Sequence, residues 1–240
     1  MGMAAGLTTG QAEGGARSVD LRLYGLLDVG VLGTDGTALG RLGAEAVAGG
    51  CTLLQYREKT IADCRATLDR LRAIQAAVGG RVPLLVNDRV DLALAAGADG
   101  VHLGQSDMHP ADARRLLGRE AIIGLTVKTA AQADELYRLP IDYACIGGVF
   151  ATSSKDNPDP PVGLVGLTRI LFRARLARGQ SLPVGAIAGI GLDNVAEVIA
   201  AGADGVAVIS SLFKAESVAG RARALRDRID AGLAARSTAR

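Results

Sequence analysis

The sequence predicts an α/β protein, a single-domain (β/α)8 TIM barrel, and three observations support this prediction. Short apolar runs alternate eight times with longer segments of helical periodicity along the 240 residues. Residues 95–101 recur word for word as residues 200–206, before the fourth and the eighth expected strand. No linker, charge block or low-complexity tract divides the chain after residue 20. A barrel of this kind typically takes about 250 residues, and an open doubly wound sheet is the alternative.

Each expected strand is a short apolar run, and each expected helix carries apolar residues at three- and four-residue spacing. Gly49 and Gly50 terminate the first helix, and Thr60 is expected to cap the second, which extends to Val78. The expected strands are residues 21–27, 51–56, 82–86, 100–103, 121–125, 143–147, 184–187 and 206–209. The expected helices are residues 37–48, 60–78, 90–96, 110–117, 130–137, 163–178, 193–200 and a terminal helix.

Composition excludes several classes of function. Hydrophobic residues make up 49% of the chain, aromatic residues 3%, and glycines number 32, which suits a sizeable core with many short loops. The net charge of +2 is too small to indicate a nucleic-acid partner, and no apolar run reaches the roughly 18 residues of a membrane span. The terminal helix is expected to carry a solvated arginine face, formed by Arg221, Arg223, Arg226 and Arg228.

The termini and the cysteines give two further expectations. Residues 1–18 lack the apolar segment of a signal peptide and are expected to form a flexible tail, followed by the barrel domain over residues 19–235. Cys51, Cys64 and Cys145 are odd in number and far apart, which favours a reduced cytoplasmic location over a disulfide framework or a zinc site. The oligomeric state stays open, a homo-oligomer included.

Asp88 and Asp107 each follow the end of an expected strand. Because neighbouring parallel strands lie about 4.8 Å apart and end at one rim, the two carboxylates should sit on adjacent loops. A pair of this kind suits Mg²⁺, which takes one or two protein carboxylates and completes its shell with water and substrate phosphate oxygens. Asn87 and Gln105 add polar groups to the same rim.

The alternative for this acid pair is helix capping. Asp88 could cap the helix over residues 90–96, and Asp107 could cap the helix that begins near Pro110. Ligands of parallel α/β folds gather at the carboxyl ends of strands, and this favours a site.

Phosphate ligands are expected at the loops after the seventh and eighth strands. Gly189 and Gly191 can leave backbone N–H groups unshielded, and residues 209–211 open a helix. The alternative is that these glycines serve only tight turns.

Basic residues are expected across the barrel mouth from the acid pair. Arg57, Lys59 and Lys155 lie in strand-end loops, and a polyanion bridged by a metal needs both signs of charge. The alternative is that each of them is merely solvated. His102 alternates with apolar neighbours and is expected to point into the barrel, as a structural, hydrogen-bonded histidine.

From about residue 21 to residue 213 these motifs resemble those of the thiamine phosphate synthase family. The matching segments are Q-Y-R-E-K at 55–59, N-D at 87–88, D-G-V-H-L-G-Q-S-D at 99–107, T-S-S-K at 152–155, A-I-A-G-I at 186–190 and G-V-A-V-I-S at 205–210. The resemblance implies a transferase of thiamine biosynthesis. It implies that 4-amino-2-methyl-5-hydroxymethylpyrimidine diphosphate reacts with a thiazole phosphate, or its carboxylated form, and that pyrophosphate leaves before the thiazole nitrogen attacks.

The resemblance also implies roles at matching positions. The residues implied to hold the pyrimidine diphosphate are Gln55, Tyr56, Arg57, Glu58, Lys59, Asn87, Thr126 and Lys155. Among these, the implied catalytic residues are Arg57, Lys59, Thr126 and Lys155. The residues implied to hold the thiazole phosphate are Thr152, Ser153, Ser154, Gly189, Ile209 and Ser210. Asp88 and Asp107 would bind Mg²⁺.

The chain departs from the family pattern at three places. Residues 126–128 read Thr-Val-Lys where Ser-x-His is frequent, Ala151 stands where proline is common, and Ala188 replaces the first glycine of a usual pair. A thiazole tautomerase, an isomerase on the same barrel, is one alternative, but it should lack the acid pair and use a histidine near Lys128. A non-catalytic phosphate-binding barrel is the other, and it need not keep both acids and both basic loops.

Overall fold

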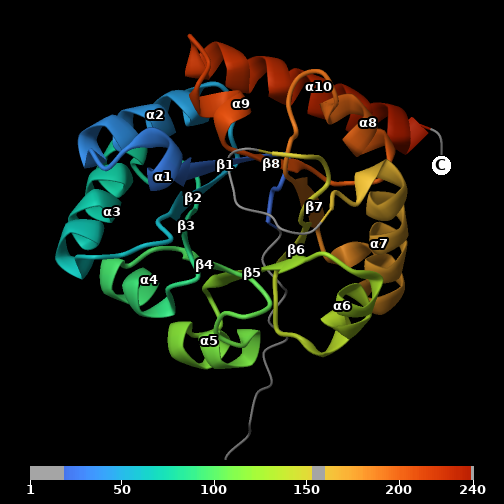
Figure 1. The fold of residues 1–240 in the computed structure, drawn as a ribbon, viewed down its shortest axis with the longest axis horizontal. Coiled ribbons are helices and arrows are strands. Elements are labelled where there is room, and N and C mark those ends of the chain that lie inside the picture. The colour runs from blue at the N-terminus through green and yellow to red at the C-terminus, as the bar shows by residue number, and fades with distance from the viewer. Residues whose placement is uncertain (1–18, 153–159, 239–240) are drawn as a thin grey trace, which may run out of the picture.

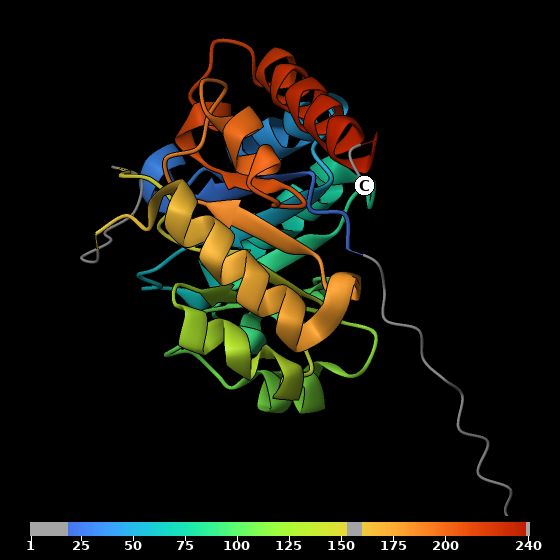
Figure 2. The same cartoon turned by 90° about the vertical axis from the view of Figure 1, so that its right-hand side faces the viewer.

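The computed structural model describes residues 19–152 and 160–238 and shows a closed barrel of parallel strands in the order β1 to β8. Figure 1 looks down the barrel, with the strands at the centre and the helices around them. The predicted barrel is confirmed, and the open-sheet alternative is wrong because β8 pairs with β1. In the side view, α7 runs along the outside of the barrel wall (Figure 2). None of the described helices is long and apolar enough to span a membrane.

Each strand is short and buried, as expected for strands covered on both faces. The strands are β1 (Leu23–Asp28), β2 (Leu53–Arg57), β3 (Leu84–Asn87), β4 (Gly100–Leu103), β5 (Ile122–Val127), β6 (Tyr143–Ile146), β7 (Val184–Ile187) and β8 (Val206–Val208). The helices are α1 (Val29–Leu32), α2 (Gly36–Ala48), α3 (Cys64–Val78), α4 (Val90–Ala96), α5 (Pro110–Leu117), α6 (Ala130–Asp134), α7 (Gly163–Arg178), α8 (Val195–Ala200), α9 (Ser210–Phe213) and α10 (Val218–Thr238), with 3-10 turns η1 (Glu135–Arg138) and η2 (Gly179–Ser181).

Five expected elements have the predicted bounds, namely α4, β4, α5, α7 and β7. The expected cap of α3 is wrong, because the helix begins at Cys64 and Asp63 accepts hydrogen bonds from Arg65 N and Ala66 N. The expected helix over residues 130–137 divides into α6 and η1, and α1 is an additional short helix.

Alternate side chains of each strand face the barrel interior. On β2, Leu53 packs in the interior cluster with Tyr24, whereas Leu54 packs in the larger cluster between strands and helices. Gly124 on β5 is opposite Tyr143 on β6, and a Cβ there would lie 2.1 Å from the Tyr143 Cζ. Glycine at this position therefore makes room for the Tyr143 ring inside the barrel.

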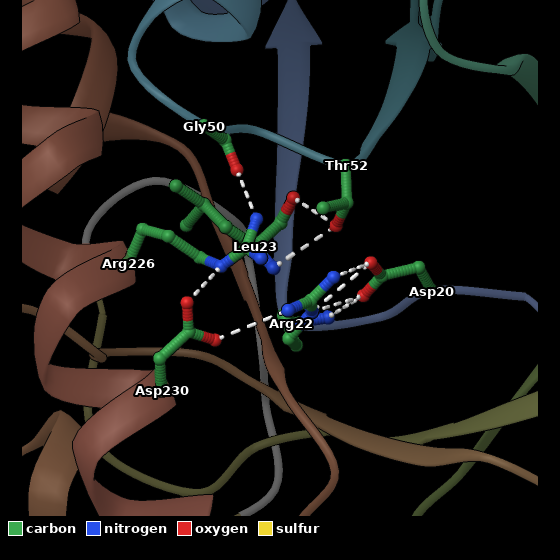
Figure 3. Close-up of polar contacts among 7 residues, drawn as sticks. All are labelled: Asp20, Arg22, Leu23, Gly50, Thr52, Arg226 and Asp230. Atoms are coloured by element: carbon green, nitrogen blue, oxygen red, sulfur yellow. Dashed lines mark hydrogen bonds and ion pairs between the residues drawn. The ribbon is translucent and has the colours of Figure 1, made fainter.

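A polar network fastens the last helix to the first strand (Figure 3). Arg226 of α10 donates to Asp230 Oδ2 at 2.8 Å and to the Gly50 carbonyl oxygen, before β2, at 2.9 Å. Asp230 also pairs with Arg22 at 3.4 Å, and Arg22 donates to Asp20. The expected solvated arginine face is therefore wrong for Arg226, whose side chain is 19% exposed.

We expect Arg226→Ala to lower the free energy of unfolding by about 1–2 kcal/mol, because a partly buried link between α10 and the start of β2 is lost. Arg223→Ala is the matched control, since Arg223 is exposed on the same helix and should change stability little. Urea denaturation measures both variants. Equal stability of Arg226→Ala and Arg223→Ala would show that the network does not fasten the helix.

Candidate active site

Two adjoining cavities open at the carboxyl ends of the strands. The charged pocket, about 370 Å³, is lined by side chains that include Gln55, Arg57, Lys59, Asn87, Asp88 and Asp107. The glycine-lined pocket, about 340 Å³, is lined by residues that include Thr152, Gly189, Gly191, Ile209 and Ser210. Both cavities share Thr126, Lys128, Ile187, Ala207 and Ile209. The barrel mouth thus offers two neighbouring compartments with a common wall.

The inward side chains at the end of β2 belong to the charged pocket. Arg57 forms a buried ion pair with Asp28, which is its register neighbour on β1. Gln55 donates from Nε2 to the Tyr24 hydroxyl, also on β1. Both predicted contact residues therefore lie where a ligand in the pocket could reach them, each held by a partner on β1.

Tyr56 and Glu58 point behind the barrel wall, toward α3. The Tyr56 hydroxyl donates to Glu58 Oε2 at 2.5 Å, and Arg70 of α3 donates to the Tyr56 hydroxyl at 2.9 Å and to Glu58 Oε1 at 2.8 Å. Burial raises the pKa of Tyr56 to about 12. Neither side chain lines either cavity, so the geometry does not support the expected substrate contact of these two residues.

Asp88 and Asp107 lie together at the mouth, as the sequence predicts. Asp88 forms an ion pair with Lys59, and Asp107 Oδ2 accepts from Gly104 N at 2.6 Å. Burial and then the neighbouring Asp107 carboxyl raise the pKa of Asp88, while Lys59 opposes the shift. The two acids therefore share one small volume with a lysine beside them.

Helix capping does not explain either acid. The N-cap of α4 is Arg89, and the N-cap of α5 is His109, whose Nδ1 accepts from Ala111 N at 3.2 Å. The capping alternative is therefore wrong for both Asp88 and Asp107.

The backbone of Asp88 is strained. Its φ is +60°, and Arg89 N donates to the Asn87 carbonyl oxygen at 2.7 Å across it, which closes a three-residue γ-turn. A non-glycine residue in such a conformation costs on the order of 1–3 kcal/mol and persists where its surroundings demand it. This turn holds the Asp88 carboxyl against Lys59 and Asp107.

Asn87, beside Asp88, carries an unsatisfied donor. Its side chain is 8% exposed and lines the charged pocket, and its Nδ2 is the buried side-chain atom in the described part of the chain that lacks a hydrogen-bond partner. An unpaired buried donor is costly, so it indicates a position that a ligand acceptor would complete.

His102 is a structural, hydrogen-bonded histidine inside the barrel, as predicted. Its Nδ1 lies 2.7 Å from the Tyr143 hydroxyl, and its Nε2 lies 2.7 Å from Thr126 Oγ1. Thr126, which both cavities share, is thus connected to the buried interior of the barrel.

The glycine-lined pocket corrects one expectation about its glycines. Gly191 N donates to Asn194 Oδ1 at 2.9 Å, so this N–H is not available to a phosphate. Gly189 has a φ of +64°, and a Cβ there would lie 2.4 Å from the Ala151 carbonyl oxygen. Ala188 has a φ of +98°, which accounts for the glycine that the family often has there.

The remaining predicted residues divide into two groups. Thr152, Ile209 and Ser210 line the glycine-lined pocket, and α9 begins at Ser210. Ser153, Ser154 and Lys155 lie outside the described residues.

Sequence reasoning missed three inward residues, Tyr24, Asp28 and Tyr143. Asp28 pairs with Arg57, but the first strand was expected to end one residue earlier, at Leu27. The available signal was the period of two along β1, which places Tyr24, Leu26 and Asp28 on the same face. Tyr143 reads from sequence as an ordinary buried aromatic residue at a strand start.

The chain is similar to known proteins over most of its length. The family model described as thiamine monophosphate synthase matches residues 32–212. The thiamine-phosphate synthase of Agrobacterium fabrum is 54% identical, over 91% of this chain and 98% of its own length, and that of Albidiferax ferrireducens is 43% identical, over 88% and 93%.

Two solved structures are similar to the structure of this chain. The thiamine phosphate pyrophosphorylase from Pyrococcus furiosus superposes with a TM-score of 0.76 at 33% identity, covering 90% of this chain and 98% of that one. A 3-hexulose-6-phosphate synthase superposes with a TM-score of 0.64 at 18% identity, over 87% and 99% of the two chains, and shares the fold alone. The family resemblance of the sequence motifs is confirmed, and the chain belongs to the thiamine monophosphate synthase family.

Proposed function

We propose that this barrel transfers the aminopyrimidinylmethyl group of its diphosphate ester to the nitrogen of a thiazole phosphate, forming thiamine phosphate and pyrophosphate. The observation that carries the proposal is the pair of adjoining cavities, one charged and one glycine-lined, with Thr126 in their common wall. A reaction between two phosphorylated heterocycles needs two compartments that meet at the reacting atoms.

The charged pocket suits the diphosphate. Arg57 and Lys59 supply positive charge, and the Asn87 Nδ2 supplies a donor that has no partner within the described residues. In a dissociative reaction the bond from the methylene carbon to the leaving oxygen breaks first, so negative charge gathers on the pyrophosphate. These preorganised groups then stabilise the leaving group more than the intact ester.

Mg²⁺ fits the same pocket on charge grounds. Among the described residues, the positive charges of Arg57, Lys59 and Lys128 equal in number the negative charges of Asp28, Asp88 and Asp107, so the charge of a bound diphosphate would leave the pocket with a net negative charge. Asp88 and Asp107 provide the one or two carboxylates that Mg²⁺ takes from a protein. No group of three or more acids, histidines and cysteines gathers within the described ranges, which disfavours an all-protein metal cage. When bound, Mg²⁺ would neutralise charge on the diphosphate oxygens.

The glycine-lined pocket suits the thiazole phosphate. Gly189 and Ser210 bring backbone from the β7 and β8 loops to its wall, where barrels of this fold often bind phosphate. The shared wall would then place the thiazole nitrogen beside the pyrimidine methylene carbon.

The acid pair separates this proposal from both alternatives. An isomerase acting on a thiazole phosphate, or a non-catalytic phosphate-binding barrel, gives no reason for a strained Asp88 next to Asp107. Lys128 also lies in the common wall where the isomerase should carry a histidine.

The three free thiols fit a reduced, cytoplasmic setting.

The direct test mixes the pyrimidine diphosphate, the thiazole phosphate and Mg²⁺ with the protein. Thiamine phosphate and pyrophosphate should form in equal amounts, as measured by liquid chromatography. Conversion of a thiazole phosphate alone, without the diphosphate, would replace the proposal with the isomerase.

We expect Asp88→Asn and Asp107→Asn to raise the Mg²⁺ concentration for half-maximal activity at least about tenfold, because each removes a charged ligand. Asparagine tolerates the left-handed backbone of Asp88, so the fold should survive. Asp91→Asn is the matched control, since Asp91 is exposed on α4 and pairs with Arg89. An unchanged Mg²⁺ dependence in both site variants would reject the metal assignment.

We expect Ser210→Asp to raise the KM for the thiazole phosphate at least about tenfold while sparing the KM for the pyrimidine diphosphate, because a carboxylate would repel the phosphate. Ser217→Asp adds the same charge outside both cavities, at an exposed position where Ser217 Oγ accepts from Gly220 N. Steady-state kinetics with each substrate varied separates the two effects. An unchanged KM for the thiazole phosphate in Ser210→Asp would show that this substrate binds elsewhere.

A further inference from the structure

A chain of hydrogen bonds crosses the barrel interior along the inner wall of the charged pocket. Gln55 Nε2 donates to the Tyr24 hydroxyl, which lies 3.0 Å from the Tyr143 hydroxyl. Tyr143 lies 2.7 Å from His102 Nδ1, and His102 Nε2 lies 2.7 Å from Thr126 Oγ1. This hydrogen-bond chain thus connects Gln55 to Thr126 through Tyr24, Tyr143 and His102. All of these residues except Tyr143 line the charged pocket.

With the Gln55 amide oriented so that Nε2 faces the Tyr24 hydroxyl, the direction of the other protons in this hydrogen-bond chain follows. Among the described residues, the hydrogen-bond partners of the Tyr24 hydroxyl are Gln55 and Tyr143. Since Tyr24 accepts from Gln55, its own proton must point to Tyr143, because an unpaired buried proton is costly. Tyr143 then donates to His102 Nδ1. His102 in turn carries its proton on Nε2.

The far end of the chain follows from this direction. With its proton on Nε2, His102 would donate to Thr126 Oγ1, 2.7 Å away, so the hydroxyl proton of Thr126 would be directed away from the histidine. Thr126 therefore presents a donor to the pocket, and Gln55, with Nε2 held by Tyr24, presents its amide oxygen as an acceptor.

Burial keeps the two tyrosines of this hydrogen-bond chain protonated. Desolvation raises the pKa of the Tyr24 and Tyr143 phenols well above the ordinary value, so both hydroxyls keep their protons. Gly124 lets the Tyr143 ring approach His102, with ring centroids 5.4 Å apart.

We propose that Tyr24, Tyr143 and His102 are positioning residues that make the charged pocket specific for an aminopyrimidine over the corresponding oxopyrimidine. The inference rests on the proposed function. An aminopyrimidine offers an N–H donor on its amino group and an acceptor on the adjacent ring nitrogen. The oxo form reverses both, with a carbonyl acceptor and a ring N–H donor. The acceptor of Gln55 and the donor of Thr126 complement the amino form and oppose the oxo form.

The test compares kcat/KM for the 4-amino and 4-oxo pyrimidine diphosphates in the parent protein and in Tyr24→Phe and Tyr143→Phe. The Tyr143 hydroxyl bonds to Tyr24 and His102 and not to Gln55. Without this hydroxyl the Tyr24 proton can turn to the Gln55 amide oxygen, which lets the amide rotate. Both variants should therefore lower the amino-to-oxo ratio at least about tenfold. An unchanged ratio in both variants overturns the inference, whereas a parent protein that consumes neither diphosphate overturns the proposed function instead.

Tyr56→Phe is the matched control. Tyr56 is also a buried phenol on a barrel strand, but its hydroxyl bonds to Glu58 and Arg70 behind the wall. Its loss should leave the amino-to-oxo ratio within about twofold of the parent. A fall in the ratio equal to that of Tyr143→Phe would show that general loosening of the barrel, and not the chain, sets the specificity.

A second measurement needs no substrate. The protein has two histidines, so ¹⁵N spectra of the imidazole rings are simple, and a His109→Asn variant, which keeps a capping residue, identifies His102. The inference predicts a neutral His102 with its proton on Nε2. A proton on Nδ1 would reverse the chain and contradict the proposal.

Discussion

Side chains alternate inward and outward along each strand of the closed barrel, and this period of two decides which residues can meet a ligand. On β2, Gln55 and Arg57 enter the charged pocket, while Tyr56 lies between them in sequence and packs against the outer helices. The same rule places Asp28 opposite Arg57 and Asn87 opposite His102, as register neighbours. Barrel closure therefore determines which strand residues line the site, independently of the loops.

The carboxyl end of the barrel concentrates groups that would be unfavourable elsewhere. Asp88 has a left-handed backbone and lies beside a second acid, and the Nδ2 of Asn87 is buried without a partner in the described structure. The opposite end carries the satisfied network of Arg22, Arg226 and Asp230. Enzymes of this fold typically have their active site at the carboxyl ends of the strands and stabilising interactions at the opposite end, and the polar groups of this barrel follow that arrangement.

The fold and the acid pair could be predicted because they depend on patterns that sequence shows directly, namely the alternation of strands and helices and acids that follow strand ends. The division of residues 55–59 could not, because five consecutive polar residues look like one cluster until the strand face is known. The sequence also could not show that the Gly191 N–H is already hydrogen-bonded, because its partner, Asn194 Oδ1, is brought to it by the conformation of the loop. The N-cap of α3 is Asp63 and not the predicted Thr60 for a similar reason. Threonine and aspartate both cap helices well, so the length of the preceding loop decides which of them is the cap.

The central claim is that the two cavities hold the two substrates at once, on either side of Thr126. Isothermal titration of the thiazole phosphate into the protein saturated with Mg²⁺ and pyrophosphate tests it most directly. Two separate compartments predict that one thiazole phosphate binds per chain with pyrophosphate still in place, with an affinity close to or higher than that in its absence. Displacement of pyrophosphate by the thiazole phosphate would contradict the claim, because it would show that both ligands compete for a single phosphate site.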